Sequence, residues 1–161
     1  MTLSARLVLA LVAVFASVAV AGCGRSSSWS ARGDTPAEPS PSPSSGGDVD
    51  AAKQAALSWL ALVDGARYAE SWDGAAAYFR GAVTKQAWTA QVGGVRGPLG
   101  ALRSRQLTSA TPATSLPGAP DGAYVVIQYQ TVFEHEASAV ETVTPMRDPD
   151  GQWRVSGYFI R

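Results

Sequence analysis

The apolar periodicity of this chain changes once, at the segment GPLG that covers residues 97–100. Before it, Trp59, Leu60 and Val63 recur at the spacing of one helix face. After it, apolar and polar residues alternate, most clearly in residues 124–133. Helices followed by antiparallel strands are typical of an α+β fold, so the sequence predicts N-terminal helices packed on a curved antiparallel β-meander.

The first part of the folded region is expected to be helical. Asp48 or Asp50 is the expected N-cap of a first helix, because a carboxylate can accept the free amides of a first turn. A second, shorter helical segment carries Tyr68 and Trp72 four residues apart, and Gly74 marks a kink or break after them.

A third helix is expected to begin at a Thr84 cap and to turn Trp88 inward. Gly97, Pro98 and Gly100 are expected to end it, because proline lacks the amide that a helix interior needs.

Four strands are expected, in residues 101–114 with an interruption near Pro112, in residues 124–133 and 138–146, and from residue 153 onward. Turn-forming residues separate them, and the EHE sequence beginning at Glu134 is expected to be a loop. The inner faces of the second and last strands are expected to carry Val125, Ile127, Tyr129, Thr131 and Phe133, and Trp153, Val155, Gly157 and Phe159. Gly157, in mid-strand, indicates a bulge, a bend or the close approach of another backbone.

Residues 1–22 have the pattern of a secretory signal peptide, with Arg6 before a short apolar run. The following VAGC segment resembles the bacterial lipobox, which implies that Cys23 is lipidated and becomes the first mature residue. The small residues 19–21 also fit ordinary signal cleavage, but a single exported cysteine at this position favours lipidation. By resemblance to bacterial lipoproteins, Gly24 favours the outer membrane, with the domain in the periplasm.

Residues 23–47 are predicted to form a disordered tether behind the lipidated cysteine. Residues 24–47 hold eight Ser, four Pro and four Gly, and such a segment buries too little apolar surface to offset the entropy of ordering. The folded α+β domain is therefore expected in residues 48–161.

Composition excludes several classes of function. The 13 basic and 13 acidic side chains give a formal net charge of zero, which is unlike a nucleic-acid-binding domain. One histidine and one cysteine cannot form a His/Cys-rich metal centre, and no phosphate-binding loop or nucleophile elbow is present. We expect no cofactor, no metal and no catalytic residue set.

Four segments carry a family resemblance: LVDGARYAESWD (residues 62–73), SLPGAPDG (115–122), YVVIQY (124–129) and WRVSGY (153–158). Together they resemble an uncharacterised bacterial family, domain of unknown function 4019, from about Ala51 onward. The order of elements also resembles the NTF2-like (cystatin-like) cone, in which helices close over a bent sheet. These resemblances imply a fold, and they supply no catalytic residues.

The candidate ligand-binding residues are Tyr68, Asp73, Tyr78 and Glu141. Glu141 alternates with Ala139 and Val143, which predicts a carboxylate on the apolar face, whereas Val140 and Met146 favour the opposite register. Asp64 is a further candidate acid, with an alternative use at a helix end.

The single histidine and a set of three arginines each have both a structural and a functional interpretation. His135, between two glutamates, could bind a cation, although a solvated hairpin explains it as well. Arg96, Arg103 and Arg105 could form a basic edge for lipid headgroups or a partner, or ordinary solvated surface.

The sequence thus predicts a lipid-anchored envelope protein, with a non-enzymatic domain that binds an envelope protein or a small apolar ligand. The alternatives are a small cone-fold enzyme that uses a pocket carboxylate and a purely structural assembly domain.

Overall fold

A computed structural model describes residues 46–161 of the chain. The predicted signal peptide, Cys23 and almost all of the tether lie outside the described residues. Within residues 46–161, no helix has the length and apolar character needed to cross a bilayer.

Helices precede strands along the chain, as the change of periodicity predicts. The helices are α1 (Gly47–Asp64), α2 (Tyr68–Asp73), α3 (Ala77–Ala82) and α4 (Lys85–Leu99). The strands are β1 (Leu102–Ala113), β2 (Tyr124–Phe133), β3 (Ala139–Arg147) and β4 (Trp153–Ile160). They form one antiparallel sheet in the order β1-β2-β3-β4, so the α+β class with a meander sheet is confirmed.

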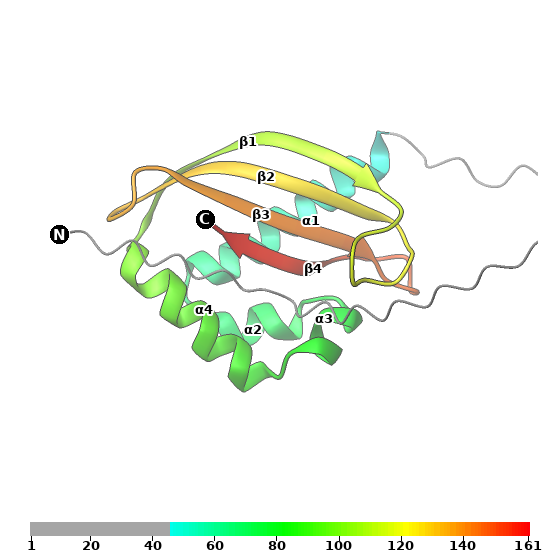
Figure 1. The fold of residues 1–161 in the computed structure, drawn as a ribbon, viewed down its shortest axis with the longest axis horizontal. Coiled ribbons are helices and arrows are strands. Elements are labelled where there is room, and N and C mark those ends of the chain that lie inside the picture. The colour runs from blue at the N-terminus through cyan, green and yellow to red at the C-terminus, as the bar shows by residue number, and fades with distance from the viewer. Residues whose placement is uncertain (1–45) are drawn as a thin grey trace, which may run out of the picture.

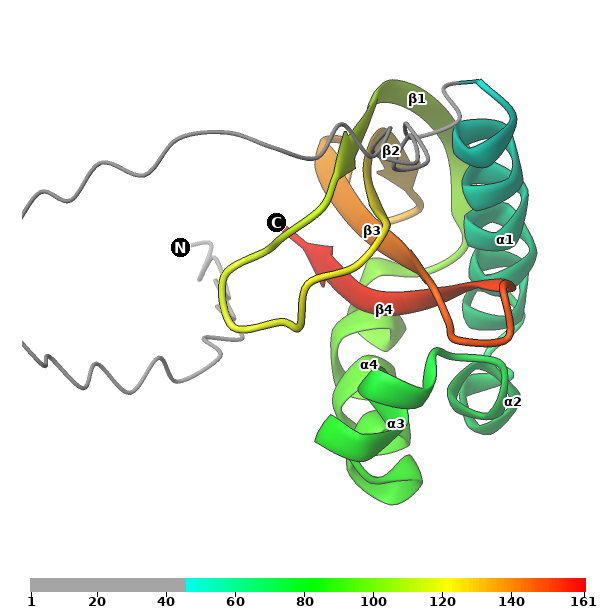
Figure 2. The same ribbon diagram turned by 90° about the vertical axis from the view of Figure 1, so that its right-hand side faces the viewer.

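The sheet curves around α1, which contacts all four strands on their inner face (Figure 1). Helices α2, α3 and α4 gather beyond the β4 edge of the sheet (Figure 2). The C-terminal half of β4 and α4 therefore lie near each other, a placement on which the candidate site depends.

The aromatic residues of the helices form one core with the sheet, as the sequence predicts. The Trp88 ring lies 5.7 Å from the Trp59 ring and 5.0 Å from the Phe79 ring, measured between centroids. These rings belong to the buried cluster that includes Val125 and Ile127 of β2. Close aromatic pairs add to the free energy gained by burying apolar area.

Ser71 accepts hydrogen bonds from the two buried indole N–H groups of this core. Trp59 Nε1 donates to the Ser71 carbonyl oxygen at 2.7 Å, and Trp88 Nε1 donates to Ser71 Oγ at 2.9 Å. Because α2 supplies both acceptors, it fixes the positions of the two tryptophans without leaving a buried donor unpaired.

Helix boundaries confirm some expectations and correct others. The chain breaks after α2 at Gly74, and Thr84 caps α4 by accepting a hydrogen bond from the Ala87 amide. The predicted Asp48 or Asp50 cap is wrong, since α1 begins at Gly47 and both carboxylates lie inside its first turn.

Gly97 and Pro98 do not end α4, which continues through Leu99. Proline near the end of a helix removes only one amide donor from the last turn, so the helix persists until Gly100.

The predicted interruption of β1 is also wrong, because Pro112 pairs in register with Val125. An edge strand tolerates proline, since only one side of its backbone faces a neighbour.

The bulge predicted at Gly157 is confirmed, and it overturns one face assignment. The register of β3 and β4 shifts where Pro145 pairs with Val155 and Thr144 pairs with Gly157. The shift skips one residue of β4 and reverses its alternation, so Tyr158 and not Phe159 packs on the helical core.

Gly100 is required by its backbone angles and by its neighbours. It has φ +76° and ψ −160°, a region that is essentially restricted to glycine. An added Cβ would lie 2.7 Å from His135 Nδ1 and 2.8 Å from Glu134 Cβ.

We therefore expect Gly100→Ala to lower the free energy of unfolding by about 1–3 kcal/mol, measured by urea denaturation. The matched control is Gly94→Ala in α4, where an added Cβ meets nothing within 4 Å. It should stabilise the protein by about 0.5–1 kcal/mol. Equal effects of the two substitutions would contradict this account of Gly100.

Candidate functional site

Four charged side chains form a neutral cluster in the interior. Arg105 donates from Nε to Glu141 Oε2 at 2.6 Å and from Nη1 to Asp64 Oδ2 at 2.7 Å. Arg96 Nη2 donates to Asp64 Oδ1 at 2.7 Å. The Glu141 side chain is 0% exposed and that of Arg96 4% exposed. Such burial is tolerated because each charge has an opposite charge beside it, although Nε and Nη1 of Arg96 are buried without a hydrogen-bond partner in residues 46–161.

The register of the sheet places Glu141 beside its partners. Arg105 of β1 pairs with Thr131 of β2, and Tyr129 of β2 pairs with Glu141 of β3. Thr131 Oγ1 donates to Glu141 Oε2 at 2.7 Å, and the Tyr158 hydroxyl donates to Glu141 Oε1 at 2.5 Å. The predicted position of Glu141 on the apolar face is confirmed, and four strands contribute to its environment.

The cluster shifts the pKa of the groups that it joins. Burial raises the pKa of Glu141, but the hydrogen bonds and charge of Arg105 and the two hydroxyls outweigh it, so the pKa lies below its usual value. Burial and then the Glu141 charge raise the pKa of Tyr158 well above its usual value. At neutral pH the carboxylate is ionised and the phenol is protonated, which is the pairing that their hydrogen bond requires.

These shifts predict how stability depends on pH. The contribution of Glu141 is present above pH 4.5, the ordinary pKa, and is lost as the pH falls through the lower pKa of the folded state. The contribution of Tyr158 is present below pH 10.0 and is lost as the pH rises through its raised pKa. Urea midpoints measured across pH should show both losses in the wild type. Glu141→Gln should remove the acid component and Tyr158→Phe the alkaline one, and unchanged pH profiles would contradict the assignment.

The cluster corrects the expectation of a basic edge. Arg96 and Arg105 are buried in ion pairs, and Arg96 also lies over the Phe133 ring, 4.2 Å from its centroid. Only Arg103 is a surface residue, with a 2.7 Å ion pair to Glu134. The three arginines therefore do not form a common surface, and two of them are not solvated.

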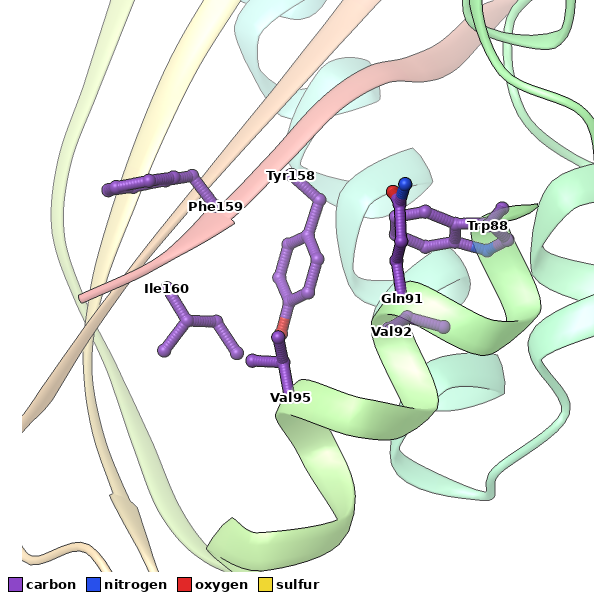
Figure 3. A pocket seen from close by; sticks show the side chains of 7 residues that line it. All are labelled: Trp88, Gln91, Val92, Val95, Tyr158, Phe159 and Ile160. Carbon is purple, nitrogen blue, oxygen red and sulfur yellow. The ribbon is translucent and has the colours of Figure 1, made fainter. Parts of the chain in front are cut away.

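A small apolar groove lies between α4 and the C-terminal half of β4. Its volume is about 60 Å³, and its lining residues are Trp88, Gln91, Val92, Val95, Tyr158, Phe159 and Ile160 (Figure 3). Tyr158 and Ile160 point to the α4 side of the strand, and Phe159 points to the other side. The lining contains no charged side chain and one amide, that of Gln91.

Tyr158 joins the groove to the charge cluster. Its ring lines the groove and lies 5.3 Å from the Trp59 ring, while its hydroxyl donates to Glu141. The groove wall is therefore held from behind by a buried hydrogen bond to a carboxylate, which fixes the ring position.

Two larger depressions lie along α1 and the N-terminal half of β4, with volumes of about 320 and 460 Å³. Their charged lining residues are already paired: Arg147 with Asp48, and Arg154 with Asp148 and Asp150. They offer broad, partly polar surface rather than a set of convergent polar groups.

The other predicted ligand-binding residues lie apart from Glu141 and from the groove. Tyr68 packs against the core from α2, and the exposed Asp73 forms a 2.6 Å ion pair with Lys85. Tyr78 donates to the Gly118 carbonyl oxygen at 2.6 Å. Within residues 46–161 no hydrogen bond or ion pair joins the four candidates to one another, so their binding role stays a prediction.

His135 lies in an exposed loop, as expected for the EHE sequence. Its amide donates to the Leu99 carbonyl oxygen, and the neighbouring Glu134 accepts from Arg103. In the described part of the chain, no three His, Cys, Asp or Glu side chains are arranged to hold a metal ion.

Comparison with known proteins supplies a family and no molecular role. The family described as "Protein of unknown function (DUF4019)" matches residues 55–158. Neither the curated proteins nor the solved structures contain a match. The matched range includes α2, α3, α4 and all the sheet except the last residues of β4. The chain belongs to the DUF4019 family.

Proposed function

We propose that this chain is a lipid-anchored bacterial envelope protein whose domain is a non-enzymatic binding module. Its binding surface is the groove between α4 and β4. The observation that carries the proposal is the groove lining, which is apolar, uncharged and backed by the aromatic core. Uncharged apolar recesses recognise apolar side chains and supply no group for acid–base chemistry.

The size of the groove favours a protein partner over a small apolar ligand. Pockets that enclose small molecules usually measure about 300–1,000 Å³, and this groove measures about 60 Å³. It has room for one side chain of a partner.

The alternative of a cone-fold enzyme needs a carboxylate that reaches substrate. Glu141 is fully buried, and its oxygens accept hydrogen bonds from Arg105, Thr131 and Tyr158. The Tyr158 ring lies between this carboxylate and the groove. The geometry therefore supports binding more strongly than catalysis.

The anchor is supported by the apolar leader, the VAGC segment and the composition of the tether. Metabolic labelling with an alkyne fatty acid tests it directly. Cys23→Ser should abolish incorporation, and undiminished labelling of that variant would refute lipidation. Fractionation of the labelled membranes would test the outer-membrane location that Gly24 favours.

The resemblance to NTF2-like cones is also part of the proposal. Its support is the order of elements, with helices before a curved four-stranded meander. A crystal structure in which α1 left the inner face of the sheet would count against it.

Photocrosslinking in intact cells tests the binding surface. A benzophenone amino acid at Gln91, on the exposed rim of the groove, should capture one envelope component repeatedly. The matched control is Gln54, an exposed glutamine on α1 outside the groove. Equal capture at both positions, or capture at neither, would overturn the groove as the binding surface.

A further inference from the structure

The outer edge of β4 runs along the groove, and in the described part of the chain, residues 46–161, no strand pairs with the C-terminal half of this edge. Arg161 exchanges both main-chain hydrogen bonds with Val140 of β3. Because the bonding direction alternates along a strand, the amide and carbonyl of Phe159 also face β3, and those of Tyr158 and Ile160 face outward. No main-chain partner of these two residues exists among residues 46–161.

The N-terminal half of the same edge is covered. The Ala76 amide donates to the Val155 carbonyl oxygen at 2.9 Å, so the segment before α3 occupies the edge there. Among residues 46–161, the outer edge of β4 thus has a main-chain contact just before the bulge and none at Tyr158 or Ile160.

The other edge strand of the sheet is protected against pairing. β1 has two register shifts, carries Pro112 in the ladder, and bears Arg103 on its exposed side. Bulges, proline and charges are devices that block strand addition. The exposed half of β4 has none of them past the bulge, since its residues are Tyr158, Phe159 and Ile160.

The two elements that form the groove carry no acidic side chain. Neither α4 nor β4 contains Asp or Glu, and the exposed Arg161 follows β4 directly. Alternation along the strand places Arg161 with Phe159, on the side turned away from α4 (Figure 3), so a segment bound along β4 meets this positive charge on that face. Acidic residues beside its apolar positions would complement this charge.

We propose that the groove binds an extended segment of another protein by strand addition to β4. The segment pairs its backbone with Tyr158 and Ile160. It places one apolar side chain between Tyr158, Val92 and Val95, and on its other face it sets an acidic residue beside Arg161. This inference rests on the proposed binding function of the groove. Strand addition uses main-chain hydrogen bonds for affinity and pockets for alternate side chains for specificity.

The shape of the site favours a single extended chain over a second copy of this protein. Helix α4 lies beyond the edge of β4 (Figures 1 and 2), and its side chains line the groove opposite that strand. The β4 edge of a second copy would bring its own α4 into the same space.

Selection of dodecapeptides from a random phage library, with the full chain in detergent as target, tests the inference. The selected peptides should alternate apolar residues and carry an Asp or Glu. N-methylation of a peptide amide that faces β4 should weaken binding at least tenfold, and N-methylation of the adjacent, outward-facing amide should change it less than twofold. Exchange of the peptide acid for Lys should weaken binding, and Arg161→Glu should restore it.

Substitutions of residues that line the groove provide a second test of the inference. Val95→Lys and Gln91→Trp should each reduce peptide affinity at least tenfold, whereas the control Gln54→Lys should leave it within twofold. Gln91 is exposed, so its variant keeps the test valid if Val95→Lys does not fold.

Amide hydrogen exchange measured by NMR distinguishes strand addition from binding in a side-chain pocket alone, because only strand addition protects main-chain amides. In the free protein, the Tyr158 and Ile160 amides should exchange faster than those of Phe159 and Arg161, and bound peptide should slow them at least tenfold.

Failure to select any peptide, or equal effects of the two N-methylations, would overturn strand addition. A dimer through β4 would overturn it as well. Capture of lipid alone from Gln91 would overturn strand addition while leaving a binding groove, and loss of specific capture at Gln91 would overturn the proposed function itself.

Discussion

Arg105→Met is expected to lower the free energy of unfolding by about 3–5 kcal/mol, because it leaves a buried carboxylate without its cationic partner. Arg105 is the shared partner of Asp64 and Glu141, and the Glu141 side chain is 0% exposed. Without the guanidinium, Glu141 keeps only two hydroxyl donors, from Thr131 and Tyr158. Methionine fills a similar volume, so the loss reports the charge rather than a cavity.

The double variant Arg105→Met with Glu141→Met is expected to be more stable than either single variant. Removing both members leaves the Asp64–Arg96 pair, and the cluster stays neutral. Replacement of a whole buried pair by apolar residues is often close to neutral, whereas removal of one member is costly. A double-mutant cycle on urea denaturation free energies would measure this coupling.

Arg103→Met is the matched control for these variants. Arg103 lies two residues before Arg105 on the same strand, but its ion pair with Glu134 joins side chains that are 59% and 41% exposed. Its loss should cost less than about 1 kcal/mol. A comparable loss at Arg103 and Arg105, or additive effects in the cycle, would contradict a coupled buried cluster.

The sequence predicts the fold class because hydrophobic period and turn residues are local signals. Alternation in residues 124–133 identifies β2 and its inner face correctly, and the Thr84 cap identifies the start of α4. These features depend on residues that are close in the sequence, so the order of the residues is enough to predict them.

The sequence cannot supply the charge cluster, because long-range pairing creates it. Asp64 ends α1, Arg105 lies in β1 and Glu141 in β3, and only the register of the sheet brings them together. An acidic residue alternating with Ala139 and Val143 was the available signal, since a carboxylate on an apolar face requires a buried cation.

The ambiguous register of β3 has a physical cause. Met146 packs with Tyr124 under the loop between β1 and β2, which supplies Leu116 and Ala119. At this end of the sheet both faces are covered, so apolar residues on β3 do not mark a single face. The reversed face of Tyr158 and Phe159 has a similar origin, because a bulge changes which residues of a strand share a face.

Trp88→Ala is expected to destabilise the protein by about 3–5 kcal/mol, the usual cost of deleting a large buried aromatic side chain. Trp88 is 6% exposed and packs edge-on to Phe79, while its indole N–H donates to Ser71 Oγ. Its removal leaves a cavity beside Tyr158 and takes away the donor to Ser71 Oγ, whose own hydroxyl still donates to the Tyr68 carbonyl oxygen. Thermal or urea denaturation would measure the loss.

Trp88→Phe separates the two contributions of this residue. The phenyl ring keeps much of the packing but removes the donor to Ser71, so the expected loss is about 1–2 kcal/mol. Leu57→Ala on the exposed face of α1, where Leu57 is 43% exposed, should cost less than about 0.5 kcal/mol. Trp88 also lines the groove, so Trp88→Ala should lose selected peptides at temperatures where it remains folded, whereas Trp88→Phe should retain them. Retention of peptide by folded Trp88→Ala would show that the aromatic core and the binding groove are independent, which the position of Trp88 in both contradicts.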